Sequence, residues 1–382
     1  MVYYAEILNC KVHVFRGKAM SEKISMDHLD RVRRNCRFII ETLGGGKPGE
    51  NAVFICDSQC RENALALSDM ALELGLHPIV IDIDSFGGER RYLRMPVMKP
   101  LREAILASDV SFMLCDQMLT DFGMFLGNTD ECDQALLGHS RRFTLEARGL
   151  MEWELDPERI LRDRERTLRL TDLLNKGGLL HVTTERGTDF SCEMVTGTDA
   201  VYPVMAIIPF YVETAVIPSL GAFNGHLVVD GASQCAYAQR GFPIRPGIPG
   251  YMETCMEPLQ IDIKDGRVCG FKGPKIQMER LEKWMYGSDP HADLADEIGL
   301  VTATSRENDR YGWLIDGTHQ THCVHVALGN NNRRGEVIHA PEHCDFDMHD
   351  PKITLDGRIL YQDRQFNDEL LFHGAGIRIP GN

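Results

Sequence analysis

A regular alternation of short apolar runs and amphipathic segments in the first 115 residues constrains the fold more than any other feature of this sequence. The apolar runs have the length of buried strands, and the segments between them repeat apolar residues at helical spacing. The predicted strands are residues 51–56, 78–83 and 110–115, and the predicted helices are residues 26–43, 60–74 and 101–108. Strands that alternate with helices form a parallel sheet with right-handed crossovers. The sequence therefore predicts an α/β domain with a parallel sheet in this region.

A strongly charged helix, predicted over residues 156–174, bridges this region and a second one that is richer in strands. Turn sequences at residues 264–266 and 355–358 contain the Asp-Gly pairs that are typical of β-hairpins. We therefore expect two domains, an α/β domain at residues 1–175 and an α+β domain at residues 176–382.

The composition excludes several classes of partner. The formal net charge is −15 over 382 residues, whereas binding to nucleic acid depends mostly on cationic residues. No apolar run is long enough to span a bilayer, and residues 1–20 lack the pattern of a signal peptide. The 12 cysteines are scattered without CxxC pairs, which is typical of reduced thiols. We expect a cytoplasmic protein with neither a nucleic-acid nor a membrane partner.

Side chains that suit a metal ion gather in the second region. His343 and Asp345 are one residue apart in a predicted strand, so both side chains are expected on the same face. His325 lies in a neighbouring predicted strand. Glu213 lies in an apolar, β-branched run, where a carboxylate is costly to bury unless it is paired or bound to metal. These four residues are candidate metal ligands.

Glu297 is the fifth candidate ligand, placed at the end of a helix predicted for residues 293–298. Two Glu, two His and one Asp suit a dinuclear hydrolytic site with zinc, cobalt or manganese. A buried histidine pair with an aspartate in a turn is the alternative interpretation.

His139 opens a segment, residues 139–149, that predicts a short helix after a loop. It is a candidate catalytic residue, against a capping or surface role.

Four segments of the second region, VETAVIP, DEIGLV, VHVALG and HCDFDM followed by DG, resemble the aminopeptidase T-like metallopeptidases in content and order. That family consists of dinuclear-metal exopeptidases with an α/β domain and a metal-binding catalytic domain. The resemblance is best over residues 146–357, and it implies a homodimer or higher homo-oligomer and a small-molecule or short-peptide substrate. It also implies that five residues are metal ligands: Glu213, Glu297, His325, His343 and Asp345.

Two features depart from that family. Where the family has a Tyr beside its metal site, this chain has Asn332, which cannot supply a phenol as ligand or acid. Residues 240–255 form a longer Pro/Gly-rich insertion between the first two ligand segments. The first departure favours a non-catalytic member that keeps the fold as a binding subunit, and the retention of five ligand types favours an enzyme.

A second branch of the same superfamily, the 2,5-dihydroxypyridine dioxygenases, is similar in fold and in the HxD segment. Those enzymes hold one ferrous ion with two His and one Asp, a facial triad that leaves positions open for substrate and oxygen. When this chain is aligned with those dioxygenases, the first His of their triad falls on Glu297 of this chain, and His325 of this chain falls on an apolar position of theirs. His139 lies near a His of that branch.

We therefore expect a metal-dependent hydrolase resembling an aminopeptidase, which cleaves a small peptide or amide with a metal-activated water. Two zinc, cobalt or manganese ions per chain are the expected cofactors, and Glu213 or Glu297 moves the proton. One alternative is a mononuclear Fe(II) dioxygenase that cleaves a dihydroxypyridine-like ring. The other is a non-catalytic binding subunit.

Overall fold

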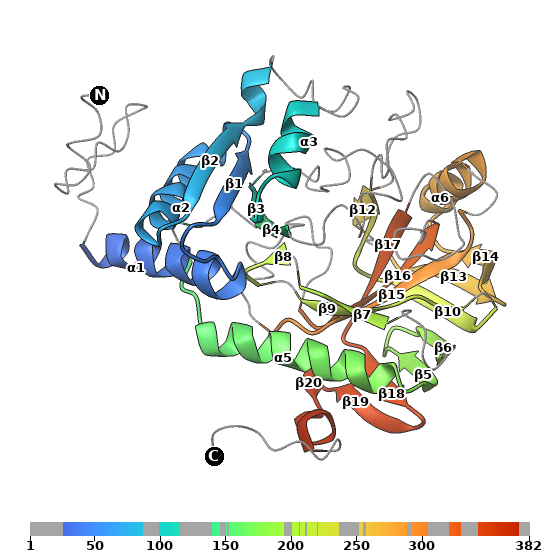
Figure 1. The fold of residues 1–382 in the computed structure, drawn as a ribbon. Helices are drawn as coiled ribbons and strands as arrows, with labels where there is room; N and C mark the ends of the chain where they lie inside the picture. Colours follow the sequence, from blue (N-terminus) through green and yellow to red (C-terminus); the bar gives the residue numbers. More distant parts are fainter. Residues whose placement is uncertain are drawn as a thin grey trace.

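The structure is a computed structural model with one parallel sheet, sheet A, and two antiparallel sheets, sheets B and C (Figure 1). It describes residues 26–86, 99–114, 140–145, 150, 153–194, 201–205, 207–210, 212–219, 221–236, 252–254, 257–288, 292–304, 321–329 and 343–373. This combination of sheets is consistent with the predicted two-domain α/β architecture. The boundary between residues 175 and 176 stays a prediction.

Sheet A is parallel throughout, with strand order β2-β1-β3-β4-β8. Its strands are β1 Asn51–Cys56, β2 His77–Asp82, β3 Val110–Leu114, β4 Arg141–Leu145 and β8 Ile207–Ile208. The neighbouring helices are α1 Met26–Arg37, the π-helix η2 Phe38–Leu43, α2 Arg61–Glu73, the 3-10 helix η3 Ile83–Phe86 and α3 Lys99–Leu106. Phe54 and Phe112 pack with α1 and α2, whereas Ile55 and Met113 pack with α3. Because both faces are covered, the central strands β1 and β3 are almost entirely buried, and the predicted parallel sheet is confirmed.

The segment that follows His139 is a strand, so the helix predicted for residues 139–149 is wrong. β4 pairs in parallel with β3 on one side and with β8 on the other. Without β4, β3 would expose an open edge of backbone donors and acceptors. Arg141, the first residue of β4, also forms an ion pair with Glu50. Pairing between distant segments therefore decides the local structure here.

Sheets B and C have the strand orders β14-β13-β10-β6-β5-β18-β19-β20 and β12-β11-β17-β16-β15-β9-β7. The strands of sheet B are β5 Gly178–Thr183, β6 Asp189–Met194, β10 Phe223–Val229, β13 Leu259–Lys264, β14 Arg267–Lys272, β18 Lys352–Leu355, β19 Arg358–Gln362 and β20 Gln365–Phe366. The strands of sheet C are β7 Val201–Val204, β9 Glu213–Val216, β11 Ala232–Ala236, β12 Met252–Thr254, β15 Ala295–Val301, β16 Cys323–Gly329 and β17 His343–His349. Both predicted hairpins form, with Asp265 and Asp356 at positive φ in their turns.

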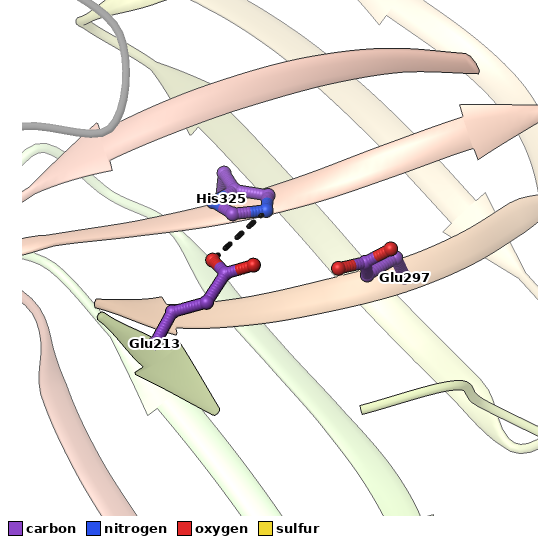
Figure 2. Close-up of side chains that lie close together, drawn as sticks. All are labelled: Glu213, Glu297 and His325. Carbon is purple, nitrogen blue, oxygen red and sulfur yellow. Dashed lines mark ion pairs between the residues drawn. The ribbon is translucent and has the colours of Figure 1, made fainter. Parts of the chain in front are cut away.

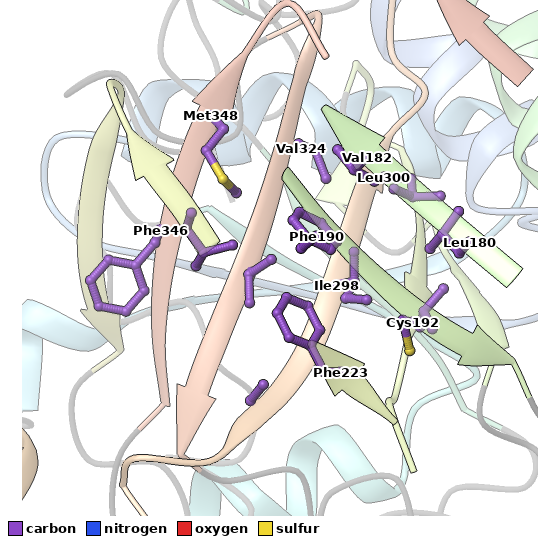
Figure 3. Packing of buried hydrophobic residues seen from close by; sticks show 14 of the residues in the cluster. Leu180, Val182, Phe190, Cys192, Phe223, Ile298, Leu300, Val324, Phe346 and Met348 are labelled. Carbon is purple, nitrogen blue, oxygen red and sulfur yellow. The ribbon is translucent and has the colours of Figure 1, made fainter. Parts of the chain in front are cut away.

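One hydrophobic core joins sheets B and C (Figure 3). Phe190 and Phe223 of sheet B stack with ring centroids 4.7 Å apart. Ile298, Val324 and Phe346 of sheet C are fully buried in the same core. Because side chains alternate along a strand, the neighbours of these three residues are turned to the opposite face of sheet C.

Helix α5, Pro157–Leu174, connects the two regions of the chain as predicted. It begins in the way helices commonly do, because the Asp156 side chain accepts a hydrogen bond from the backbone N–H of Arg159. Near its start, Ile160 packs in the core of sheet A. Near its end, Leu170 and Leu174 pack in the core between sheets B and C. The helix thereby fixes the candidate site on sheet C relative to sheet A.

Two further helical segments lie near the end of the described chain, α6 Lys275–Ser288 and the π-helix η8 Glu369–His373. None of the helices in the described ranges is long and apolar enough to cross a membrane. The cysteines whose side chains the structure describes are free thiols, and all of them except Cys269 are buried, in agreement with the sequence prediction.

Candidate metal centre

Three of the predicted ligands lie on the face of sheet C that is turned away from the core. His325 in β16 is directly opposite Gly299 in β15, and Gly299 is opposite Ala215 in β9. Glu213 is two residues from Ala215 in β9, and Glu297 is two residues from Gly299 in β15. Residues that are opposite each other, or two apart in one strand, share a face. Three adjacent strands therefore bring these side chains together.

A β-bulge in β15 sets the orientation of Glu297. The pairing register between β15 and β16 shifts between Ala295 and Glu297, so Asp296 is an extra residue. Ala295 packs in the core, and strict alternation would turn Glu297 to that same core face. The bulge reverses this phase and turns Glu297 toward His325. The helix predicted for residues 293–298 is therefore wrong, since Glu297 lies within a strand.

The three side chains form a buried group (Figure 2). Glu213, Glu297 and His325 each offer one ligand atom, and these atoms lie within 4.8 Å of one another. The residues are 4%, 8% and 1% exposed, and Nε2 of His325 is 3.6 Å from Oε2 of Glu213. Imidazole and carboxylate donors at this separation suit a transition-metal ion or zinc. The residues present therefore fit a metal ion.

The charges around His325 are those of carboxylates. Burial acts to lower the pKa of His325, but the negative charges of Glu213, Asp345 and Asp347 raise it above its ordinary value, with a further contribution from Glu297. A site that attracts a proton so strongly also attracts a metal cation, because both respond to the same negative potential.

The remaining predicted site residues do not belong to this group of three. Asp345 in β17 is 8% exposed and lies opposite Ala327, which is in turn opposite Glu297. It therefore shares the face of the three clustered residues without belonging to their 4.8 Å group. His343 is the first residue of β17, and the description of that residue is limited to its backbone. His139 and Asn332 lie outside the described residues.

Two buried aspartates on these strands were missed by the sequence analysis. Asp347 is fully buried and lies directly opposite His325. The sequence did contain a signal for it, since the alternation that links His343 to Asp345 continues to position 347. Asp296 is also fully buried, but the bulge that places it breaks the alternation along β15, so alternation does not predict its face.

Hydroxyl groups hold helix α5 against the opposite face of the strands that bear the two glutamates. The Oγ1 atoms of Thr167 in α5 and Thr302, next to β15, are 2.6 Å apart. Thr302 also donates to the backbone carbonyl of Val212, and the hydroxyl of Thr214 donates to the carbonyl of Thr167. Thr214 and Val212 flank Glu213 in the chain. This network of Thr167, Thr214 and Thr302, which we call the threonine network, ties β9 and β15 to one helix.

No protein-family model and no curated protein matches the chain. Solved structures that share its fold include the following two proteins. The 2,5-dihydroxypyridine dioxygenase of Pseudomonas putida KT2440 aligns with 88% of this chain and 97% of its own, at 15% identity and a TM-score of 0.58. Wild-type AmpT of Thermus thermophilus aligns with 89% of this chain and 99% of its own, at 11% identity and a TM-score of 0.55.

These two proteins represent the two branches that the sequence resembles. Nearly the whole length of each aligns with this chain, so the predicted relationship is confirmed at the level of the fold. At 11–15% identity the likeness concerns architecture alone. The chemistry of this chain must therefore be argued from its own side chains.

Proposed function

We propose that this chain is a metal-dependent hydrolase that cleaves a small peptide or amide. The observation that carries the proposal is the buried group of Glu213, Glu297 and His325, whose ligand atoms lie within 4.8 Å of one another. Burying two carboxylates beside one imidazole is costly without a cation to compensate them. A catalytic metal ion supplies that cation.

The number of carboxylates favours two ions over one. Glu213, Glu297, Asp345 and Asp347 are all less than 9% exposed, and the charge of each raises the pKa of His325. Four carboxylates carry four negative charges, which two divalent ions balance and a single divalent ion does not. This argument supports a dinuclear hydrolytic centre of zinc, cobalt or manganese.

Each residue has a separate role in this proposal. Glu213, His325 and Asp345 would hold the ions, and the sequence resemblance implies His343 as a further ligand. Ions bound there would polarise the scissile carbonyl and lower the pKa of a bound water. Glu297 accepts the proton of the attacking water on its carboxylate and passes it to the leaving amine. We assign this role to Glu297 because the carboxylate of Glu213 is paired with His325 at 3.6 Å.

Metal content is the decisive measurement for this proposal. The full-length protein is purified without a metal-affinity tag and dialysed, and its metals are identified and counted by mass spectrometry. We expect two ions of zinc, cobalt or manganese per chain, together with hydrolysis of aminoacyl amides. A dialysed protein without stoichiometric metal would contradict the proposal and favour a non-catalytic binding subunit.

A mononuclear iron dioxygenase is the second candidate, and the fold likeness to a 2,5-dihydroxypyridine dioxygenase supports it. A facial triad needs two His and one Asp around one ferrous ion. The described donors that group with His325 within 4.8 Å are instead two glutamates, which favours hydrolysis. One iron per chain, with oxygen consumption in the presence of a dihydroxypyridine, would establish the second candidate instead.

The sequence resemblance supports a small-molecule or short-peptide substrate and a homo-oligomer. Light scattering on the purified protein tests the oligomeric state. A monomer at micromolar concentration would contradict that part of the proposal and leave the metal centre untouched.

A further inference from the structure

We propose that Gly299 is a positioning residue of the candidate metal centre, because any side chain at this position would separate His325 from Glu213. The proposal deepens the proposed function and rests on it, since it concerns ligands of the same centre. No role has been assigned to Gly299 so far, and it carries no group that binds metal.

Gly299 lies directly beneath the paired side chains. It is opposite His325 on one side and Ala215 on the other. A Cβ atom built on Gly299 would overlap Cε1 and Nε2 of the His325 ring and would lie 2.6 Å from Oε2 of Glu213. The imidazole therefore crosses β15 through the space that a side chain at position 299 would occupy.

The ring has little freedom to yield to such a side chain. His325 is 1% exposed and surrounded by packed atoms, so it has no solvent to move into. The neighbouring strand on its other side, β17, presents the fully buried Asp347 directly opposite. A methyl group at position 299 would push the ring toward Asp347 and thus away from Glu213.

Backbone conformation does not explain this glycine. Gly299 is not among the described glycines that have a positive φ, so an L-residue can adopt its backbone conformation. Glycine also weakens the interior of a strand, and its presence there often marks a close approach of other atoms. The room that the site requires is therefore the reason for the glycine.

The test compares Gly299→Ala with Gly270→Ala. Gly270 is also a strand glycine without a positive φ, and a Cβ atom there would meet only the end of the Asp262 side chain, at 3.2 Å. Metal affinity, crystal structures of the metal-free proteins and thermal stability are measured for both variants and for the wild type. We expect Gly299→Ala to bind metal about 100-fold more weakly. We also expect a distance from Nε2 of His325 to Oε2 of Glu213 above 4 Å in its metal-free crystal.

The double variant Gly299→Ala/His325→Ala keeps the test informative if the single variant is not stable enough to crystallise or to be titrated with metal. Removing the imidazole removes the overlap with the ring and leaves only the contact with Oε2 at the flexible end of Glu213. Gly299→Ala should therefore lower the melting temperature much less in the His325→Ala background than in the wild type. An unchanged metal affinity with the 3.6 Å pairing intact, or equal destabilisation in both backgrounds, would overturn the inference. A wild-type protein that binds no metal would instead overturn the proposed function. The distance from Nε2 of His325 to Oε2 of Glu213 and the comparison of melting temperatures would still test the role of Gly299.

Discussion

At the residue scale, Glu213 and Glu297 have different roles and should respond differently to the same substitution. Glutamine keeps the size of glutamate and one oxygen ligand but cannot accept a proton. Glu297→Gln should therefore retain metal and lose about 100-fold or more in kcat, because general base catalysis contributes factors of this size. Glu213→Gln should lose metal, because Glu213 is a ligand in this proposal and the neutral amide no longer offers the negative charge that holds the cation. Metal content and kcat of the two variants are measured in parallel.

A Glu297→Gln enzyme with wild-type kcat would contradict the assignment of the proton to Glu297. Asn224→Asp, an exposed change on the far sheet, is the control for altering one charge, and it should change neither metal content nor kcat.

Each candidate residue of the site has a local signal in the sequence. Glu213 and His325 interrupt apolar strands, where a polar side chain needs a reason. Which of these residues come within 4.8 Å of one another depends on strand order, and no local pattern encodes that order. Asp347 shows the same limit, since alternation gave its face and only the pairing of β16 with β17 placed it opposite His325.

At the element scale, the error at residues 293–298 has a specific cause. The bulge in β15 breaks the alternation of period two, because Ala295 faces the core and Glu297 faces the opposite side. A run of that kind has no strand period and was interpreted as a helix. The error at residues 139–149 has another cause, since β4 is a strand that fills a place in sheet A between β3 and β8. In both segments, the strand forms by pairing with segments that are distant in the sequence.

At the same scale, we expect the threonine network to contribute to both stability and metal affinity. Thr302→Val keeps the shape of the side chain but removes the hydroxyl that contacts Thr167 and donates to the carbonyl of Val212. We expect a loss of about 1–3 kcal/mol in stability, since buried polar partners are left unsatisfied. We also expect metal affinity to fall about 10-fold, because β9 and β15 carry Glu213 and Glu297. Chemical unfolding and metal titration measure the two effects.

Thr188→Val is the matched control for this prediction. Thr188 is 1% exposed and its hydroxyl bonds with the backbone N–H and carbonyl of Val228 in sheet B. Its loss should reduce stability by a similar amount and leave metal affinity unchanged. Equal effects of the two substitutions on metal affinity would show that the threonine network does not position the glutamates.

At the scale of the whole molecule, the sequence predicted the parallel sheet of the first region and the hairpins of the second. It did so because crossovers and tight turns are local in sequence. It did not predict that the second region divides into two sheets packed on one core, since strands of sheets B and C alternate along the chain. The chain passes from sheet B to sheet C directly after β10, at Asp230.

At that junction, a hydrogen-bonded pair formed by Asp230 and His349 makes the stability of the folded protein depend on pH. The carboxylate of Asp230 accepts hydrogen bonds from the backbone and the Nδ1 atom of His349 in β17, at 3.0 and 3.3 Å. The bond to Asp230 raises the pKa of His349 above its ordinary value of 6.5. Burial opposes ionisation of Asp230, but the hydrogen bonds from His349 outweigh it and lower the pKa of that carboxyl below 3.8.

The pair therefore stabilises the fold within a defined pH window. Because the pKa of His349 is raised in the folded state, its contribution to the free energy of unfolding is complete below pH 6.5. That contribution is lost as the pH rises through the higher pKa of the folded protein. The contribution of Asp230 is complete above pH 3.8 and is lost only in stronger acid. We expect His349→Gln to lower the free energy of unfolding by about 1–2 kcal/mol at pH 5.5 and by much less at pH 9.

Urea unfolding of the wild type and the variant from pH 5 to pH 9 measures this difference. Glu50→Gln is the comparison, because burial acts to raise the pKa of Glu50 but hydrogen bonds from Arg141 and the backbone of Lys47 lower it, and no histidine contributes. A lowered carboxyl pKa gives a contribution that stays constant above pH 4.5, so the effect of Glu50→Gln should not change over this range. If the effect of His349→Gln were also constant, the Asp230–His349 pair would not be the source of the pH dependence.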